Sequence, residues 1–303
     1  MHSILALGAT HLSLTVPSGQ KYLSAAVEHR GIALKSLAEM MSRQCSSLDM
    51  SHMLATCYAL TFQSHYMPDS LVDFAVMVRG CALMTDRIQS AFASSAIFTL
   101  NECYEFLSIL ERISPTASID PILVDTYLKT LVPLLGRLET HAQHQWYYCL
   151  VNVLTSLKHS DKDAYLMFTR LYRVWYDIDH SQFLEFLSGE NPVSQILLLH
   201  FIAVHVIMIP ILIQAGPTRI MESPLVTFAF LQWADAIYDR LPLSVRQDVQ
   251  WPMNFIKSAK TLRDMDALKD LVSTGSNIYL SRITGVEGTL DDSIATLDLE
   301  IQE

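Results

Sequence analysis

The pattern of apolar and polar residues is dominated by one stretch, Ile196 to Ile213. Its eighteen residues include no Asp, Glu, Lys or Arg, and only His200, His205 and Pro210 interrupt the hydrocarbon side chains. A helix that is apolar on every side either crosses a membrane or forms the centre of a large soluble α-domain. The histidines, the proline, the lack of a second such run and the lack of an adjacent Lys/Arg cluster favour the soluble interpretation. We therefore predict a central core helix at about residues 193–213 and no membrane span.

In the rest of the chain, apolar residues recur at intervals of three and four, which predicts further helices. No segment alternates apolar and polar residues over the length of a strand, so the predicted fold class is all-α. Asp49 or Ser51 is expected to cap one of these helices. The predicted helices cover residues 20–42, 52–64, 72–88, 100–113, 122–141, 143–157, 161–176, 181–187, 225–240 and 244–271, the last of them divided near Trp251–Pro252. We predict a single multi-helix bundle over residues 1–275 and a weakly ordered acidic tail over residues 276–303.

Charge and cysteine content exclude several classes of function. The formal net charge is −10 and no run of Lys or Arg occurs, so the chain lacks the basic side chains with which proteins grip nucleic acid directly. The five cysteines are never closer than twelve residues apart, which excludes a Cys-x-x-Cys metal knuckle and a dense disulfide framework. Free thiols and an N-terminus without a basic leader segment indicate an intracellular protein of the nucleus or cytoplasm.

Three groups of residues, spread over most of the chain, together carry a family resemblance. They are Tyr22–Ser24 with Glu28–Gly31 and Ala33–Leu34; Leu54–Tyr58 with Thr61–Ser64, Tyr66–Asp69, Leu71–Asp73 and Val78–Leu83; and Trp175, Phe183–Leu187, Asn191–Pro192, Leu198–Phe201, Trp233, Leu241–Pro242 and Trp251–Pro252. In combination they resemble the C-terminal regulatory region of fungal binuclear zinc-cluster transcription factors. The branch they resemble most is that of the sterol uptake control proteins.

This resemblance implies an all-α bundle that senses an apolar small molecule, a sterol in the sterol uptake branch, and controls an attached DNA-binding domain. The six-cysteine zinc cluster that reads DNA has no counterpart in this sequence. The resemblance therefore implies either a regulatory domain separated from its DNA-binding cluster or a protein that kept the bundle and acquired another use.

The candidate ligand-binding residues are polar, aromatic or polarisable groups in or near the apolar centre. They are His200, His205, Met208, Trp233, Tyr66, Phe74 and Trp251. An apolar pocket orients its ligand with few polar groups, so either histidine is a candidate hydrogen-bond donor to a ligand oxygen; the alternative is a satisfied core histidine. Five residues turn a helix by about 140°, so His200 and His205 cannot bind one metal ion together. We expect no metal and no cofactor, and the sequence identifies no catalytic residue, because no nucleophile elbow, phosphate loop or dinucleotide fingerprint is found.

These observations lead to three hypotheses. The first is a regulatory domain that binds a sterol- or terpenoid-like molecule between the central helix and the C-terminal helices. The second is a stand-alone enzyme of the same fold that catalyses a cyclisation or cycloaddition of a hydrophobic substrate without a cofactor, by folding the substrate and polarising one carbonyl. The third is a dimerising interaction module, with a second copy of the chain as partner.

Overall fold

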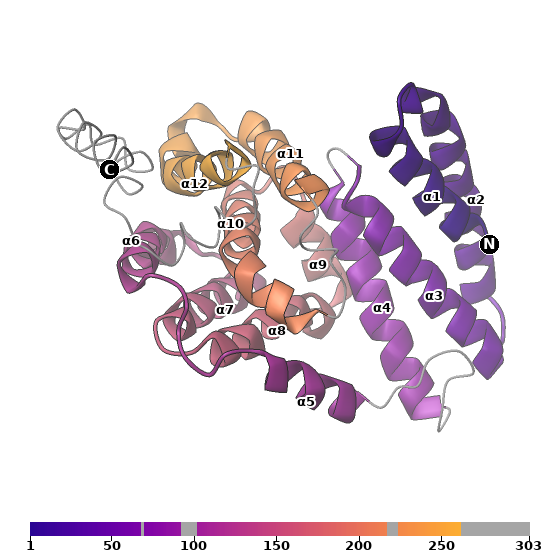
Figure 1. Cartoon of the computed structure of the whole chain (residues 1–303), viewed down its shortest axis with the longest axis horizontal. Helices are drawn as coiled ribbons and strands as arrows, with labels where there is room; N and C mark the ends of the chain where they lie inside the picture. The colour runs from indigo at the N-terminus through magenta and orange to yellow at the C-terminus, as the bar shows by residue number, and fades with distance from the viewer. Residues whose placement is uncertain (68–69, 92–101, 217–223, 262–303) are drawn as a thin grey trace, which may run out of the picture.

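The computed structural model of the chain describes residues 1–67, 70–91, 102–216 and 224–261, which form twelve α-helices and three short 3-10 helices (Figure 1). No β-strand occurs among these residues, and the predicted all-α fold class is confirmed. The helices are α1 (His2–Thr15), η1 (Gly19–Tyr22), α2 (Leu23–Met41), α3 (Ser47–Ser64), α4 (Leu71–Ala91), α5 (Glu102–Arg112), α6 (Pro121–Leu131), η2 (Val132–Arg137), α7 (His141–Leu157), α8 (Asp161–Asp177), α9 (His180–Leu187), α10 (Pro192–Ala215), α11 (Pro224–Arg240), η3 (Leu243–Val249) and α12 (Gln250–Thr261).

Helix α10 is the centre of a bundle, as its apolar sequence predicts. Asn191 caps its first turn by accepting a hydrogen bond from the Ser194 amide, and Pro192 stands at the start, where its missing N–H costs no hydrogen bond. Every residue from Ser194 to Ile211 is buried, and helices α7, α8, α9, α11 and α12 pack around α10 (Figure 1). By length and composition this helix could cross a membrane, but its enclosure by protein fits the core helix of a soluble domain.

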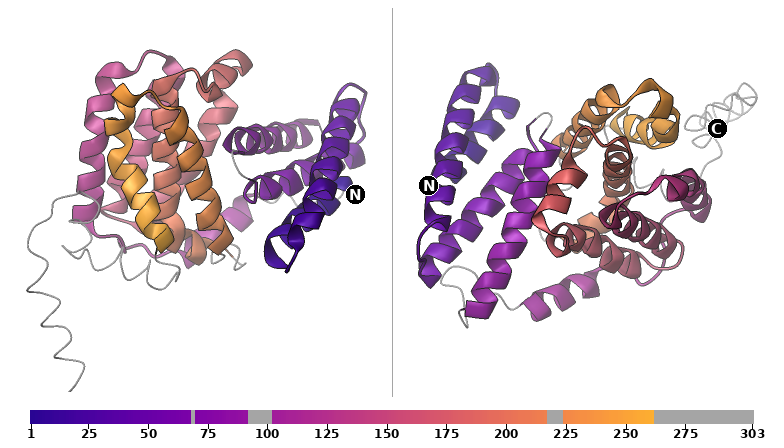
Figure 2. Two further views of the ribbon diagram at one scale, coloured as in Figure 1. Left: turned by 90° about the horizontal axis from the view of Figure 1, so that it is seen from above. Right: turned by 180° about the vertical axis from the view of Figure 1, so that it is seen from behind.

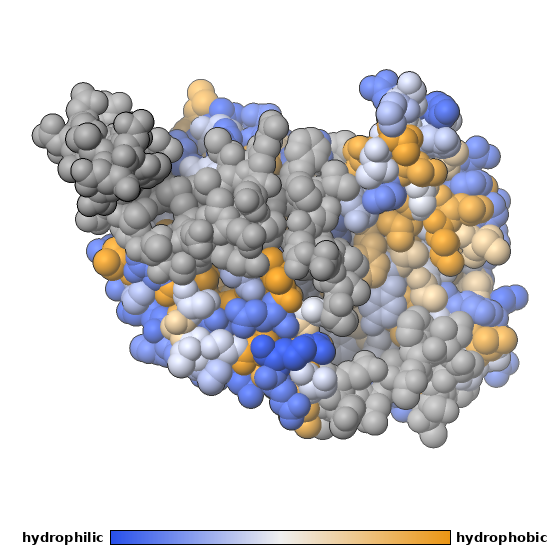
Figure 3. All heavy atoms as spheres, viewed as in Figure 1, coloured by the Kyte–Doolittle hydropathy of each residue, from blue (hydrophilic) through white to orange (hydrophobic). Residues whose placement is uncertain are grey.

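Helices α1 to α4 form a layer beside this bundle, seen most clearly from above (Figure 2). Helix α1 pairs with α2, and α3 pairs with α4, so the layer consists of two helical hairpins. Apolar side chains gather over these N-terminal helices on the molecular surface (Figure 3). Helix α3 begins earlier than predicted and is capped by Ser46 instead of Asp49 or Ser51. The Ser46 hydroxyl accepts a hydrogen bond from the Asp49 amide, and the Asp49 carboxylate accepts one from the Ser46 amide.

Polar contacts of Arg79 and Trp233 join the layer to the bundle. On α4, the Arg79 guanidinium donates hydrogen bonds to the carbonyl oxygens of Trp175 at 2.7 Å and Ile178 at 2.9 Å, which satisfies carbonyl groups at the end of α8. On α11, the Trp233 indole N–H lies 3.1 Å from the Ser70 hydroxyl oxygen, just before α4. Both contacts hold α4 against helices that surround α10.

The continuous helix predicted over residues 122–141 is wrong. Helix α6 ends at Leu131, and Val132–Arg137 form the 3-10 helix η2, with α7 beginning at His141. Pro133 cannot donate the hydrogen bond that an α-helix requires at its position, which accounts for the break. The tail predicted over residues 276–303 lies outside the described residues.

Candidate functional site

A groove opens where the N-terminal layer meets the bundle. Its volume is about 400 Å³, which falls within the range of small-molecule sites. Side chains from α3, α4 and α8 line it: Tyr58, Val78, Cys81, Ala82, Thr85, Asp86, Gln89, Tyr172, Arg173 and Tyr176. The α4 positions are spaced three and four residues apart, so they lie on one face of that helix. We refer to these residues together as the tyrosine groove.

The tyrosine groove combines apolar and polar surfaces. Small apolar side chains of α4 form one wall, among them Val78 and Ala82. Its aromatic residues are tyrosines, whose rings pack on hydrocarbon. Burial and a hydrogen bond with the Asp86 carboxylate on α4 raise the pKa of Tyr176. The charged residues Asp86 and Arg173 are exposed at its edge, and the Arg173 guanidinium lies 5.8 Å from the centre of the Tyr176 ring. Such a lining fits a mainly apolar ligand that carries a polar group.

Tyr172 connects the groove to the central helix. Its hydroxyl forms a short hydrogen bond with Nε2 of His205 on α10. The Nδ1 atom of the same imidazole lies 2.9 Å from the carbonyl oxygen of Phe201. A carbonyl oxygen can only accept, so Nδ1 carries the proton and Nε2 accepts the hydrogen bond from Tyr172. A groove residue is thereby fixed to the middle of the apolar core.

Burial keeps this pair uncharged. Burial lowers the pKa of His205 to about 3, the hydrogen bond to Phe201 opposes that shift, and the nearby His65 adds to it slightly. Burial also raises the pKa of Tyr172 well above its usual value, and the neighbouring Tyr165 acts in the same direction. At neutral pH His205 is therefore a neutral acceptor and Tyr172 a neutral donor. The pair suits fixed hydrogen bonding rather than proton exchange near neutral pH.

Aromatic rings surround His205 on several sides. Its ring centre lies 4.1 Å from that of Phe201, 4.7 Å from Phe168 and 5.2 Å from Phe230. Beyond Phe230, the rings of Trp233 and Phe74 are 5.3 Å apart. These rings connect α4, α8, α10 and α11 in one packed cluster.

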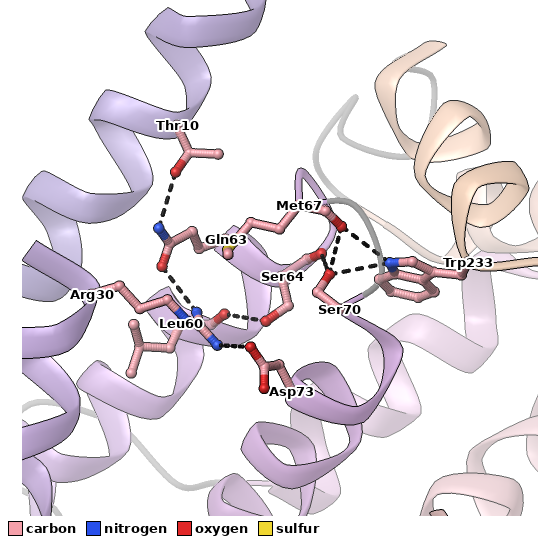
Figure 4. A network of polar contacts seen from close by, with 9 residues as sticks. All are labelled: Thr10, Arg30, Leu60, Gln63, Ser64, Met67, Ser70, Asp73 and Trp233. Atoms are coloured by element: carbon pink, nitrogen blue, oxygen red, sulfur yellow. Dashed lines mark hydrogen bonds and ion pairs between the residues drawn. The ribbon is translucent and has the colours of Figure 1, made fainter. Parts of the chain in front are cut away.

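A hydrogen-bond network fixes Trp233 within this cluster (Figure 4). The indole N–H points toward the Ser70 hydroxyl and the Met67 carbonyl oxygen, at 3.1 and 3.3 Å. The Ser70 hydroxyl in turn donates to the Met67 carbonyl at 2.6 Å. Trp233 is 1% exposed, so its polar atom is satisfied inside the protein.

The predicted ligand-binding residues fall into separate places. His205, Phe74 and Trp233 belong to the aromatic cluster behind the tyrosine groove. Tyr66 lies at the end of α3, with its ring 6.2 Å from that of His11 on α1. Met208 is fully buried in the core around α10. None of these residues lines the tyrosine groove, so their role in ligand binding stays a prediction.

His200 and Trp251 lie in a different cluster, against α6. The His200 and Tyr127 rings stack with centres 5.6 Å apart, and the Tyr127 and Trp251 ring centres are 4.5 Å apart. Tyr127 donates a hydrogen bond to the His200 carbonyl oxygen at 2.7 Å. Burial lowers the pKa of His200 to about 3, and an interaction with the backbone of Asp248 opposes this shift. By the geometry of a full hydrogen bond, neither ring nitrogen has a partner among the described residues. His200 is therefore a neutral core ring.

A second groove, near the start of α10, has a different chemistry. Its volume is about 720 Å³, and its lining includes Glu139, Glu185 and Glu190. Arg137, which also lines it, forms a salt bridge with Asp248. An acidic lining of this kind suits water and cations better than an apolar ligand. For the predicted class of ligand, the smaller tyrosine groove is the better site.

No family model, curated protein or solved structure matches the chain. The resemblance to fungal zinc-cluster regulators therefore stays a prediction.

The prediction from sequence missed Tyr172 and the groove that it lines. Tyr172 and Tyr176 are one helical turn apart on α8, which places both on one face of the helix. That spacing was visible in the sequence. The sequence did not show that α4 lies opposite that face.

Proposed function

We propose that this chain binds an apolar, sterol- or terpenoid-like molecule in the tyrosine groove, as the regulatory domain of a fungal transcription factor. The observation that carries the proposal is the contact of Tyr172 with both the groove and His205 of the central helix. It fixes the ring of Tyr172 beside the apolar wall of α4, while the polar groups of the groove lie at its edge, on Asp86 and Arg173. Sterols and many terpenoids have the matching chemistry, a large hydrocarbon skeleton with one or a few oxygen atoms.

A regulatory role is supported by the position of the groove between the layer and the bundle. A ligand there would touch α4 on one side and α8 on the other. The same two helices are joined by Arg79, whose guanidinium contacts the end of α8 and lies 4.6 Å from the Phe183 ring centre on α9. A ligand that binds one relative position of α4 and α8 more tightly than another would shift the population toward that position.

The alternative is a cofactor-free cyclase that folds a hydrophobic substrate in the same groove. The observation in its favour is the hydroxyl of Tyr172, which could donate a hydrogen bond to a substrate carbonyl if it released His205. The inward hydrogen bond opposes this use, because breaking it would leave the buried Nε2 of His205 without a partner. We therefore place binding first.

The proposal can be tested by titrating the chain with dehydroergosterol, a fluorescent sterol, and with farnesol as a competitor. Ala82→Trp fills the groove from the α4 wall, and Ala38→Trp places the same side chain on an exposed position of α2 as a matched control. We expect saturable sterol binding that Ala82→Trp weakens at least tenfold and Ala38→Trp leaves unchanged. Equal binding by both variants would reject the tyrosine groove as the site. Turnover of farnesol or a related polyene, detected by mass spectrometry, would favour the cyclase.

A further inference from the structure

Helix α1 buries two hydroxyl residues, Ser3 and Thr10, while its large apolar residues Ile4, Leu5, Leu12 and Leu14 are exposed together with His11 and Thr15. The buried positions are Ser3, Ala6 and Thr10, whereas Ile4 is 65% exposed and Leu5 is 43% exposed. A surface helix of a soluble protein normally shows the opposite arrangement. The orientation of α1 about its axis therefore has a specific cause.

The cause is the buried guanidinium of Arg30 on α2 (Figure 4). Arg30 is 6% exposed and donates hydrogen bonds to the side chains of Gln63 at 3.0 Å and Asp73 at 2.9 Å. The Gln63 amide donates in turn to the Thr10 hydroxyl oxygen on α1, also at 3.0 Å. A buried charge requires polar neighbours, and Thr10 completes this set. With Thr10 held inward, the opposite face of α1 must point outward.

The outward face is apolar and continuous with α2. Helix α1 pairs with α2, with the His2 and His29 rings 5.0 Å apart, and α2 exposes Val27 two residues before His29, with 61% of its surface accessible. We define the apolar N-terminal face as the exposed positions Ile4, Leu5, Gly8, Leu12, Leu23 and Val27. Together they expose on the order of 500 Å² of surface, as much as the largest apolar patch of a typical monomer, and such patches commonly mark an interface.

We infer that the apolar N-terminal face binds the same face of a second copy of the chain, in a two-fold symmetric dimer. The face is suited to pairing with itself, because Ile4 and Leu12 stand four residues before and after Gly8. If two α1 helices cross at Gly8 in antiparallel directions, Ile4 of each copy lies against Leu12 of the other. A Cβ atom at Gly8 would meet nothing within 4 Å in the single chain, so open space lies where a second helix would cross.

Charge and area also favour a second copy. Helix α1 contains no Asp, Glu, Lys or Arg, so pairing it with itself brings no like charges together. The apolar N-terminal face, with on the order of 500 Å² in each copy, would bury about 1,000 Å² in a dimer, which is the lower limit for a specific interface. A lipid surface fits less well, because interfacial helices carry Lys and Arg beside their apolar face and this chain has a net charge of −10.

The test is sedimentation equilibrium of the full chain between 1 and 100 µM, concentrations on the order of those used for transient interfaces. We expect a mass that rises toward twice the 34.2 kDa of one chain. Val27→Lys and Gly8→Arg place charge at the centre of the face and should weaken association at least tenfold. Leu243→Lys alters an 81% exposed leucine on η3 and should leave association unchanged.

Circular dichroism distinguishes a variant that has lost the interface from one that has lost its fold. Gly8 and Val27 are both exposed, so both variants are expected to fold, and one folded variant is enough for the test. A wild-type chain that remains at 34.2 kDa at the highest concentration would overturn the dimer. So would variants that associate as strongly as wild type while keeping their helical spectrum. Flotation of the wild-type monomer with phosphatidylcholine vesicles, abolished by Val27→Lys, would overturn the dimer and assign the face to lipid instead.

Discussion

The hydroxyl of Tyr172 donates its hydrogen bond inward, to Nε2 of His205, although Tyr172 also lines the tyrosine groove. His205 is part of α10, and its Nδ1 donates a hydrogen bond to the carbonyl oxygen of Phe201, one turn earlier in the same helix. The Tyr172–His205 hydrogen bond thus joins the groove wall to the central helix, and the His205–Phe201 hydrogen bond fixes the imidazole ring within that helix. This connection has consequences for stability that can be measured without knowing the ligand.

Tyr172→Phe should destabilise the protein by about 1–3 kcal/mol, because the buried Nε2 of His205 loses its donor. The free energy of unfolding is measured by urea titration followed by circular dichroism. Tyr148→Phe is the matched control, since Tyr148 is 52% exposed, and it should change stability by less than about 0.5 kcal/mol. Equal stability of the two variants would show that the Tyr172 hydrogen bond contributes nothing.

The two histidines of α10 should respond differently to replacement by phenylalanine. His205→Phe leaves the Tyr172 hydroxyl without its acceptor and should cost about 1–3 kcal/mol. His200→Phe removes ring nitrogens for which the described residues provide no hydrogen bond, so its cost at pH 7 should be smaller, below about 1 kcal/mol. The same urea titration compares them. A larger loss for His200→Phe than for His205→Phe would contradict the assigned contacts.

Acid should destabilise the folded chain through these buried imidazoles. Burial lowers the pKa of His200 and His205 to about 3 in the folded protein, whereas an unfolded histidine titrates near 6.5. Between those values the unfolded state binds protons that the folded state does not, so the free energy of unfolding decreases as pH falls from about 6.5 toward 3. Each histidine contributes about 1.4 kcal/mol per pH unit in that window.

Comparison of wild type with His200→Phe isolates this effect from the titration of carboxylates. The free energy of unfolding of the variant should fall less steeply between about pH 6.5 and 4.5, so that its stability relative to wild type improves in acid. Parallel curves over this interval would mean that His200 is not held neutral by burial.

Two glycines provide opposite tests of the N-terminal hairpin. Gly31→Ala should stabilise the protein by about 0.5–1 kcal/mol, because the position lies within α2 and an added Cβ meets nothing within 4 Å. Gly19→Ala should destabilise it by about 1–3 kcal/mol, because its Cβ would lie 2.5 Å from the backbone oxygen of Ser13. Thermal unfolding of both variants, measured below the concentration of any self-association, checks the prediction. A rise in melting temperature for Gly19→Ala would contradict the described close approach.

The central helix could be predicted because its signal is local. An apolar sequence with no charged residue between Ile196 and Ile213 leaves burial on all sides as the arrangement compatible with a soluble protein. The signal for the start of α10 is equally local, because Asn at a helix cap and Pro in the first turn are favoured in any fold, and Asn191 and Pro192 occupy these positions. The all-α class follows from the same kind of pattern.

The groove could not be predicted because it depends on which helices are neighbours. Helical spacing places Val78 and Ala82 on one face of α4, and Tyr172 and Tyr176 on one face of α8, but it does not bring the two faces together. Their approach is set by tertiary contacts such as that of Arg79 with the end of α8. Helical spacing correctly predicted that His200 and His205 point to different sides of α10. It could not identify their neighbours, which are Tyr127 for His200 and Tyr172 for His205.

The orientation of α1 would have been predicted incorrectly from hydropathy alone. Ile4 and Leu5 would be placed inside and Ser3 and Thr10 outside, whereas the structure has the reverse. The deciding interaction is the burial of Arg30, which donates to the Gln63 side chain, while the Gln63 amide donates in turn to the Thr10 hydroxyl oxygen. A charged residue on one helix can therefore determine the orientation of another.

Photo-crosslinking tests the central claim, a ligand in the tyrosine groove, most directly. The chain is irradiated with a sterol that carries a diazirine in its ring system, and the labelled peptides are identified by mass spectrometry. We expect labelling within residues 78–89 of α4 and 172–176 of α8, reduced by an excess of unlabelled sterol and by Ala82→Trp. Competable labelling confined to the surroundings of His200 and Trp251, with α4 and α8 unlabelled, would contradict the account.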